Sequence, residues 1–204
     1  MKIGKMTMII QTTKINQRRN ITNMTNQPTP PYTRHSGRII YLSGEISEFV
    51  AQEINIEMIK LQRDDPLDDI TMIVDSYGGD LFAAFSIVDM MEMITCDIQT
   101  ICIGKAMSAG QFIFSSGTKG KRYMSPHSRL MLHSPSAGME GSVPDIEIEI
   151  EELQRNRDLC VHHISKHSNL DEKATRELIN RNAYLNAEES IKMGFADGIL
   201  KRLK

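Results

Sequence analysis

The sequence predicts an α/β protein built around a mostly parallel sheet. Two patterns point to this class: short apolar runs of strand length recur along the chain, and between most of them apolar residues repeat at helical spacing. Strands and helices that alternate in this way form crossover units, in which consecutive strands run parallel. With 204 residues, of which 40% are hydrophobic, the chain can form one domain around a single core.

The predicted strands are the short apolar runs, beginning with the sequence RIIYL. They occupy residues 38–42, 70–74, 98–103, 121–123, 129–133 and 198–200. After the second run, Gly78-Gly79 predicts a turn, because two adjacent glycines commonly mark one.

Six segments are predicted to be helical: residues 47–62, 81–93, 108–116, 145–167, 171–178 and 187–193. The first is expected to end at Asp64-Asp65-Pro66, since proline does not continue a helix. In the fourth, residues 146–151 alternate apolar and acidic side chains, a pattern that alone would indicate a strand. The absence of a helix breaker up to His167 favours a helix of about six turns. A glycine-containing loop is expected before it, at residues 137–144.

Residues 1–36 differ from the rest of the chain because they are rich in Thr, Asn, Gln and Pro. Such a segment buries little apolar surface, so it is predicted to be flexible. It would serve as a leader, a pro-segment or an arm that contacts a partner, or it is simply disordered. The predicted organisation is therefore a flexible segment at 1–36 and one domain at 37–204.

Composition excludes several classes of function. A net charge of −2 and a pI of about 6.3 provide no basic field for nucleic acid. No apolar run approaches the ~20 residues that a membrane-spanning helix needs, and no signal peptide is recognised. We therefore expect a cytoplasmic protein without nucleic-acid or membrane partners. Cys96, Cys102 and Cys160 are scattered, which favours reduced core cysteines over disulfides or metal ligands.

Ser108 and His133 are the first candidates for catalysis. Ser108 follows the strand at 98–103 and has small neighbours, whereas His133 ends the apolar run at 129–133. Each has an ordinary alternative role, since a serine that opens a helix is most often an N-cap and a histidine in an apolar strand is most often a core residue. The segment also departs from the G-x-S-x-G nucleophile motif, because Ala106 replaces the first glycine.

Taken together, three features favour a catalytic role for Ser108 and His133 over these ordinary roles. Gly78-Gly79, Ser108 and His133 each follow a predicted strand, and the carboxyl edge of an open α/β sheet is where sites form. Serine needs a neighbouring base to become a nucleophile, and the attacked carbonyl needs fixed N–H donors. The glycine pair and the Ala109 N–H would supply these donors. The set predicts a serine hydrolase that needs no cofactor and no metal.

Five segments at colinear spacing resemble the ClpP family, the proteolytic subunits of the Clp ATP-dependent proteases, and the resemblance extends from about Gly37 to Leu200. The segments are residues 76–79, 103–110, 117–123, 128–135 and 138–148. In order, they resemble the family's Ser-Pro-Gly-Gly, its nucleophile segment, its Gly-x-x-Gly-x-Arg, its Ser-Arg-x-Met-x-His-x-Pro, and its Gly-rich strand with the start of the long handle helix.

The resemblance implies a β/α spiral of the ClpP/crotonase type with a protruding handle helix. It implies Ser108 as nucleophile, His133 as general base, and the N–H groups of Gly79 and Ala109 as the oxyanion hole. It further implies seven-membered rings stacked in pairs as a tetradecamer, a chamber that receives unfolded polypeptides, and docking of an AAA+ unfoldase of the ClpX, ClpA or ClpC type.

The sequence departs from the family pattern in three places: Asn182, residues 1–36 and Tyr77. The family's third catalytic residue is an Asp, which here aligns with Asn182, so the triad would be Ser108–His133–Asn182. An Asn can orient the histidine but carries no charge to stabilise the imidazolium, so reduced or conditional activity is expected unless a nearby carboxylate substitutes. Residues 1–36 lack the family's recognisable axial-loop segment, which argues against unfoldase docking. Tyr77 replaces a proline.

Three other functions are compatible with the sequence: an inactive ClpP-like subunit in a mixed ring, a phage-type maturation peptidase that acts without an unfoldase, and a crotonase-type acyl-CoA enzyme. The context of Ser108 and His133 argues against the last. On the long helix, His163 and His167 have the i, i+4 spacing of metal ligands. With no third ligand nearby, a solvated face that includes His162 is the favoured interpretation.

Overall fold

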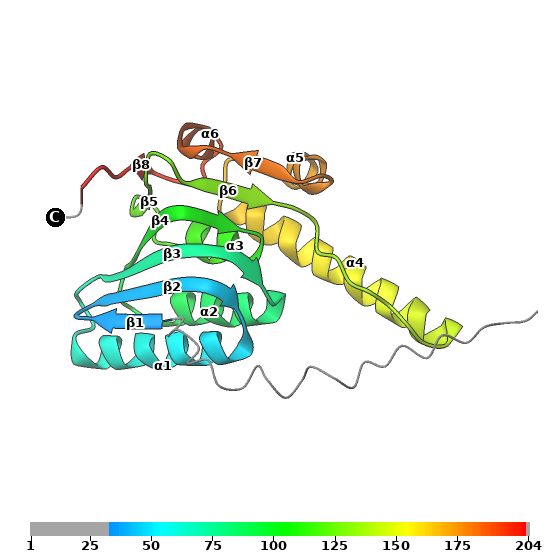
Figure 1. Cartoon of the computed structure of the whole chain (residues 1–204), viewed down its shortest axis with the longest axis horizontal. Helices are drawn as coiled ribbons and strands as arrows, with labels where there is room; N and C mark the ends of the chain where they lie inside the picture. The colour runs from blue at the N-terminus through cyan, green and yellow to red at the C-terminus, as the bar shows by residue number, and fades with distance from the viewer. Residues whose placement is uncertain (1–32, 203–204) are drawn as a thin grey trace, which may run out of the picture. The chain divides into compact units, whose positions relative to one another are not determined.

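The structure is a computed structural model that describes residues 33–202. Within this part of the chain it confirms the α/β class, with one eight-stranded, mostly parallel sheet whose main path runs β1-β2-β3-β4-β5-β8 (Figure 1). The strands are β1 Thr33–Ser36, β2 Ile39–Ile46, β3 Ile70–Gly79, β4 Ile98–Met107, β5 Arg122–Met124, β6 Arg129–Leu132, β7 Ala183–Leu185 and β8 Gly198–Ile199.

The sheet divides at β4. The first part of this strand pairs in parallel with β5 and the second part pairs in parallel with β6. Strand β6 then pairs antiparallel with β7. This fork brings the end of β6 beside the end of β4, although residues 108–128, which include a helix and the whole of β5, separate the two strands in sequence.

The helices of the same region begin and end close to their predicted positions. They are α1 Glu48–Asp64, α2 Leu81–Met93, α3 Ala109–Ser115, α4 Val143–Lys166, α5 Glu172–Ile179 and α6 Ala187–Lys192. The side chains of Ser47, Asp80 and Asp171 cap α1, α2 and α5, each accepting a hydrogen bond from an N–H of the first turn, which satisfies a donor that the helix itself leaves free.

The core lies between the sheet and α1, α2 and α3, where fully buried side chains such as Leu42, Ile54, Met72 and Ile87 come from both layers. All three cysteines are buried and unpaired, as predicted. Burial raises the pKa of Cys102 and of Cys160 to about 12, because an apolar environment disfavours the thiolate. Among the described residues no helix is long and apolar enough to cross a membrane.

Some strands differ from their predictions. Strand β3 continues through Gly78-Gly79, so the predicted turn is wrong: these glycines pair with Glu45 and Ile46 of β2. Backbone pairing needs no apolar side chain, and apolar runs therefore underestimate strand length. Strand β7 was not predicted. Strand β1 pairs with β2, so Thr33–Ser36 belong to the sheet rather than to a flexible segment; residues 1–32 of that segment lie outside the described residues.

Helix α4 has two unlike halves. Near its C-terminal end Cys160, Val161, His163 and Ile164 are buried against the domain. Residues 143–159 are exposed or half-buried throughout, and this half extends away from the sheet (Figure 1). The helix therefore rests on the domain by its last two turns.

The interpretation of the α4 histidines as a solvated face is wrong for His163, which is 6% exposed, and holds for His162. The His163 ring packs edge-on against Phe85 and Phe112, and its Nε2 lies 3.1 Å from Ser116 Oγ. Burial, followed by the nearby His167, lowers the pKa of His163 to about 3. No group of three metal-ligating side chains is present among the described residues.

Arg122, from the predicted Gly-x-x-Gly-x-Arg segment, has a structural role. It is 4% exposed, and its guanidinium contacts both oxygens of Asp197 just before β8, with Nη2 2.7 Å from Oδ1. Burial alone would raise the pKa of Asp197, but the hydrogen bonds from Arg122 outweigh it and lower the pKa. The pair fixes the chain that leads into the edge strand.

We predict that His163 makes the fold sensitive to acid. Between about pH 6.5 and 3 the unfolded chain binds a proton at this position and the folded chain does not, so stability rises with pH across this window and falls on acidification. His163→Gln should reduce the slope by up to ~1.4 kcal/mol per pH unit. Urea unfolding at several pH values measures this slope. The exposed His162→Gln is the control, and equal slopes for both variants would contradict the prediction.

Candidate active site

The site is assembled where β3, β4 and β6 end. Met107 of β4 pairs with Met131 of β6, and the next backbone N–H, that of Ser108, donates to the Met131 carbonyl at 2.8 Å. His133 directly follows β6. The parallel pairing of β4 with β6 therefore delivers Ser108 and His133 to the same edge, as the sequence predicted.

Ser108 has an unusual backbone conformation. Its φ of 52° and ψ of −123° make it the single non-glycine residue with positive φ among residues 33–202. An L side chain adopts such angles at a cost of about 1–3 kcal/mol, and such strain is often found at functional sites. Ser108 occupies the N-cap position of α3 but makes no capping hydrogen bond with its side chain, so the N-cap interpretation does not explain it.

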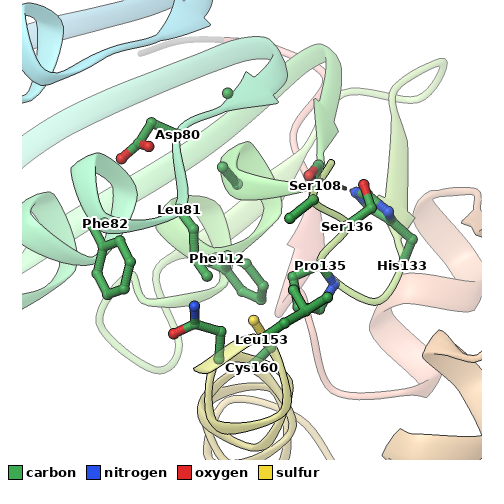
Figure 2. Close-up of a pocket in the computed structure, with 14 residues that line it drawn as sticks. Asp80, Leu81, Phe82, Ser108, Phe112, His133, Pro135, Ser136, Leu153 and Cys160 are labelled. Carbon is green, nitrogen blue, oxygen red and sulfur yellow. Dashed lines mark hydrogen bonds between the residues drawn. The ribbon is translucent and has the colours of Figure 1, made fainter. Parts of the chain in front are cut away.

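The hydroxyl of Ser108 instead contacts His133. Oγ lies 2.7 Å from Nε2 (Figure 2), which is a full hydrogen bond. His133 is half-buried, so it is not the enclosed core histidine of the ordinary interpretation. When the ring proton is on Nδ1, Nε2 accepts the serine proton, which is the arrangement that a general base requires.

Glycine is required at both positions of the pair. A Cβ on Gly78 would lie 2.7 Å from the Met107 carbonyl and 2.8 Å from Ser108 Cβ, and one on Gly79 would overlap the backbone of Ile46. Their φ angles, 104° and 155°, are also ones that other residues rarely adopt. The Gly78 N–H donates to Ser76 Oγ at 2.9 Å, which leaves the Gly79 N–H as the candidate oxyanion donor of the pair.

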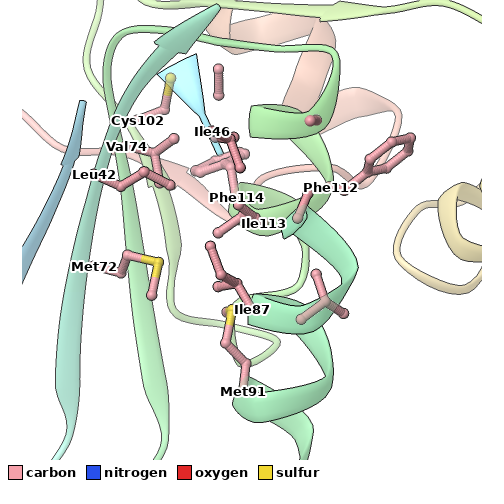
Figure 3. Close-up of a cluster of buried hydrophobic side chains, with 14 of the residues drawn as sticks. Leu42, Ile46, Met72, Val74, Ile87, Met91, Cys102, Phe112, Ile113 and Phe114 are labelled. Carbon is pink, nitrogen blue, oxygen red and sulfur yellow. The ribbon is translucent and has the colours of Figure 1, made fainter. Parts of the chain in front are cut away.

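The core holds the serine turn in place. All seven residues of α3 are buried, and Ile113 and Phe114 lie among Val74, Met72 and Ile87 from β3 and α2 (Figure 3). Phe112 points to the other side of α3, toward α4. Packing on both sides fixes the start of α3, and with it the N–H of Ala109.

A cavity of about 370 Å³ lies next to the Ser108–His133 pair, within the range of ligand pockets. Both proposed oxyanion residues, Gly79 and Ala109, line it. Figure 2 shows Ser108 and His133 on one side, Asp80 and Phe82 on the other, and α4 below. The remaining walls of the cavity come from the start of α2, from α3, from the loop after His133 and from α4: Leu81, Phe112, Pro135, Ser136, Ala137, Leu153, Asn156 and Cys160.

Asn182 makes no hydrogen bond with Ser108 or His133 among the contacts of residues 33–202. It is exposed and precedes β7. Because Leu132 pairs with Ala183, the next step of this antiparallel register sets residue 182 opposite His133. Among residues 33–202, however, the one side-chain hydrogen bond of His133 is that to Ser108. The structure thus brings together Ser108, His133, Gly79 and Ala109, and leaves Asn182 on the neighbouring strand segment without a hydrogen bond to His133.

Tyr77, the third departure from the family pattern, does not disturb this arrangement. Its side chain is 71% exposed, and its ring lies 4.3 Å from the ammonium of Lys105. Lys105 in turn forms a 2.7 Å ion pair with Asp75, and this hydrogen bond raises the pKa of the lysine.

Sequence reasoning missed most of the pocket wall. Leu153, Asn156 and Cys160 lie on α4, far along the chain from Ser108, and no local pattern connects them to it. Asp80 did offer a signal in the sequence, because it directly follows the glycine pair that was predicted to form the oxyanion hole.

A strained serine between a strand and a helix, bonded to a histidine beside a pocket, is the arrangement of the serine hydrolases. Several families of serine hydrolase combine such a pair with an α/β fold, so the fold alone does not identify the family. The family model for Clp protease matches residues 30–203, and the chain belongs to this family.

We predict that Ser108→Gly is more stable than Ser108→Ala by about 1 kcal/mol, although both lose the hydroxyl. Alanine keeps a Cβ at positive φ, whereas glycine removes this strain at a smaller entropic cost. Chemical denaturation of the two variants measures the difference. At Ser116, where φ is −78°, the order should reverse and Ala should be the more stable; the same order at both positions would contradict strain at Ser108.

Proposed function

We propose that this protein is the proteolytic subunit of an ATP-dependent Clp protease, a serine endopeptidase that cleaves unfolded polypeptides inside an oligomeric chamber. The observation that carries the proposal is the 2.7 Å contact between Ser108 Oγ and His133 Nε2 beside a cavity of about 370 Å³. ATP would act through a partner unfoldase, and the chemistry itself would need no cofactor.

In the proposed reaction Ser108 Oγ attacks the peptide carbonyl carbon while its proton moves to His133 Nε2. The oxyanion accepts hydrogen bonds from the N–H groups of Gly79 and Ala109. The C–N bond then breaks as His133 returns the proton to the leaving amine. Water then attacks the acyl carbon while giving a proton to His133. The C–O bond to Ser108 breaks as His133 passes this proton to Oγ, which releases the carboxylic acid and restores the serine.

Asn182 would orient His133 through its side-chain carbonyl. It would accept a hydrogen bond from Nδ1–H after a small movement across the β6–β7 pair, since the register already sets the two residues opposite each other. A neutral amide stabilises the imidazolium less than a carboxylate does. We therefore propose an attenuated or conditional peptidase.

Assembly into stacked heptameric rings is proposed from α4. Its projecting half exposes Val143 and Ile148 at 71% and 65%, together with Ile150 and Leu159. Exposed apolar side chains along a helix that leaves its own domain are typical of a contact with another chain. Cytoplasmic localisation and docking of an AAA+ unfoldase are part of the same proposal, and rest on membership of the family.

A second candidate is an inactive or weakly active subunit that shapes a mixed ring. The exposed position of Asn182, with no hydrogen bond to His133, favours it. The strained Ser108 argues against it, because the strain has no evident structural use. The phage-type maturation peptidase that acts without an unfoldase differs from the first candidate in partners rather than in chemistry.

Labelling with a fluorophosphonate probe tests the active site. We expect labelling of the purified protein that is lost in Ser108→Ala and His133→Ala and rises roughly tenfold or more in Asn182→Asp, because the carboxylate restores charge to the histidine. Asn180→Asp, which adds the same charge two residues away, should leave the rate unchanged. Gel filtration of the same samples reports the oligomeric state.

The outcomes separate the candidates. Labelling of the wild type supports the peptidase, whereas labelling of Asn182→Asp alone supports a subunit that has lost its orienting acid. If neither the wild type nor Asn182→Asp is labelled, the roles of Ser108 and His133 are wrong.

A further inference from the structure

Asp80 gives the pocket a negative charge. Among the residues of 33–202 that line the cavity beside Ser108, it is the one acidic residue, and none is Lys or Arg. The carboxylate is exposed at the start of α2 and lies on the Phe82 side of the cavity, across from Ser108 (Figure 2). A substrate side chain that enters the pocket from the serine would therefore extend toward it.

One of the two carboxylate oxygens of Asp80 is available to bind a substrate side chain. Oδ1 accepts the Ala83 N–H at 2.7 Å and caps α2. Oδ2 has neither a hydrogen-bond partner nor an ion-pair partner within the described part of the chain. Capping explains why a polar residue stands at position 80, but it needs only one oxygen and no charge, since Asn and Ser cap equally well.

The walls between Ser108 and Asp80 suit a long side chain. Leu81, Phe82, Phe112 and Leu153 are apolar, and Phe112 is almost completely buried at 5% exposure. Lysine and arginine bury their methylene stems against such surfaces while the charged end reaches a polar partner. A glutamate on the same path would bring two carboxylates together.

We propose that Asp80 determines specificity at the residue on the acyl side of the scissile bond, favouring Lys or Arg and disfavouring Glu or Asp. This inference rests on the proposed function, since it assumes that Ser108 attacks a peptide. The apolar walls still accept uncharged side chains, so Asp80 biases the preference rather than making it absolute.

The size of the bias follows from the exposure of the carboxylate. Exposed ion pairs change binding by at most about fivefold. We therefore expect a lysine substrate to exceed its norleucine counterpart by roughly threefold, and a glutamate substrate to fall below it by a similar factor. High salt should reduce both differences.

The test uses three peptides that are identical except for Lys, norleucine or Glu before a coumarin amide. Their kcat/KM values are compared in the wild type and in Asp80→Asn, which keeps the cap and removes the charge. Asp171→Asn is the matched control, because Asp171 caps α5 with the same 2.7 Å bond but does not line the pocket. Binding of the same peptides to Ser108→Ala, with and without Asp80→Asn, is measured by competition against a fluorescent peptide.

The proposal predicts a Lys/Glu ratio near ten that falls toward one in Asp80→Asn and is unchanged in Asp171→Asn. An unchanged ratio in Asp80→Asn overturns the role of Asp80 and leaves the peptidase standing. If no peptide is cleaved but Ser108→Ala binds them with the Asp80-dependent ratio, the proposed function fails and the charge preference of the pocket stands. If no peptide is cleaved or bound, both are wrong.

Discussion

The close approach of β3 to the turn at Ser108 is the constraint on which the site depends. Residue 78 has no room for a side chain, because a Cβ there would lie within 3 Å of both Met107 and Ser108. The end of β3 therefore packs directly against the turn that contains Ser108, just after β4. This packing sets the distance between the N–H groups of Gly79, the last residue of β3, and Ala109, the first residue of α3. Both residues line the cavity, as Ser108 does.

The strain at Ser108 is maintained by the structure on either side of it in the chain. The Met131 carbonyl holds its N–H from β6, while α3 is buried along its whole length. A turn fixed on both sides cannot relax to ordinary backbone angles without disturbing the core. The same packing links the site to the base of α4, since Phe112 lines the cavity and also contacts the buried ring of His163.

The sequence alone predicted those parts of the candidate site where only one or two residue types can meet a local physical requirement. Adjacent glycines, a serine among small residues and a histidine after an apolar run predicted a set of residues that the structure places together, because few residue types satisfy each local requirement. The sequence did not predict features in which the contacting residues are distant in the chain. The fork of β4 between β5 and β6, the pairing of β7 with β6, and the part of α4 that lines the pocket depend on tertiary packing. His163 was misassigned for the same reason: its helix face is buried by α2 and α3, and Phe85 and Phe112 give no sign of this from their own segments.

The two halves of α4 have a consequence for hydrogen exchange. Amides near Cys160 and Ile164 lie in a turn packed against the domain, so they exchange only when much of the domain opens. Amides near Val143 belong to a helix that has no such support, and an unsupported helix of this length is marginal in water. A single isolated chain should therefore show a gradient of protection along one continuous helix, and anything that covers the outer half would remove that gradient.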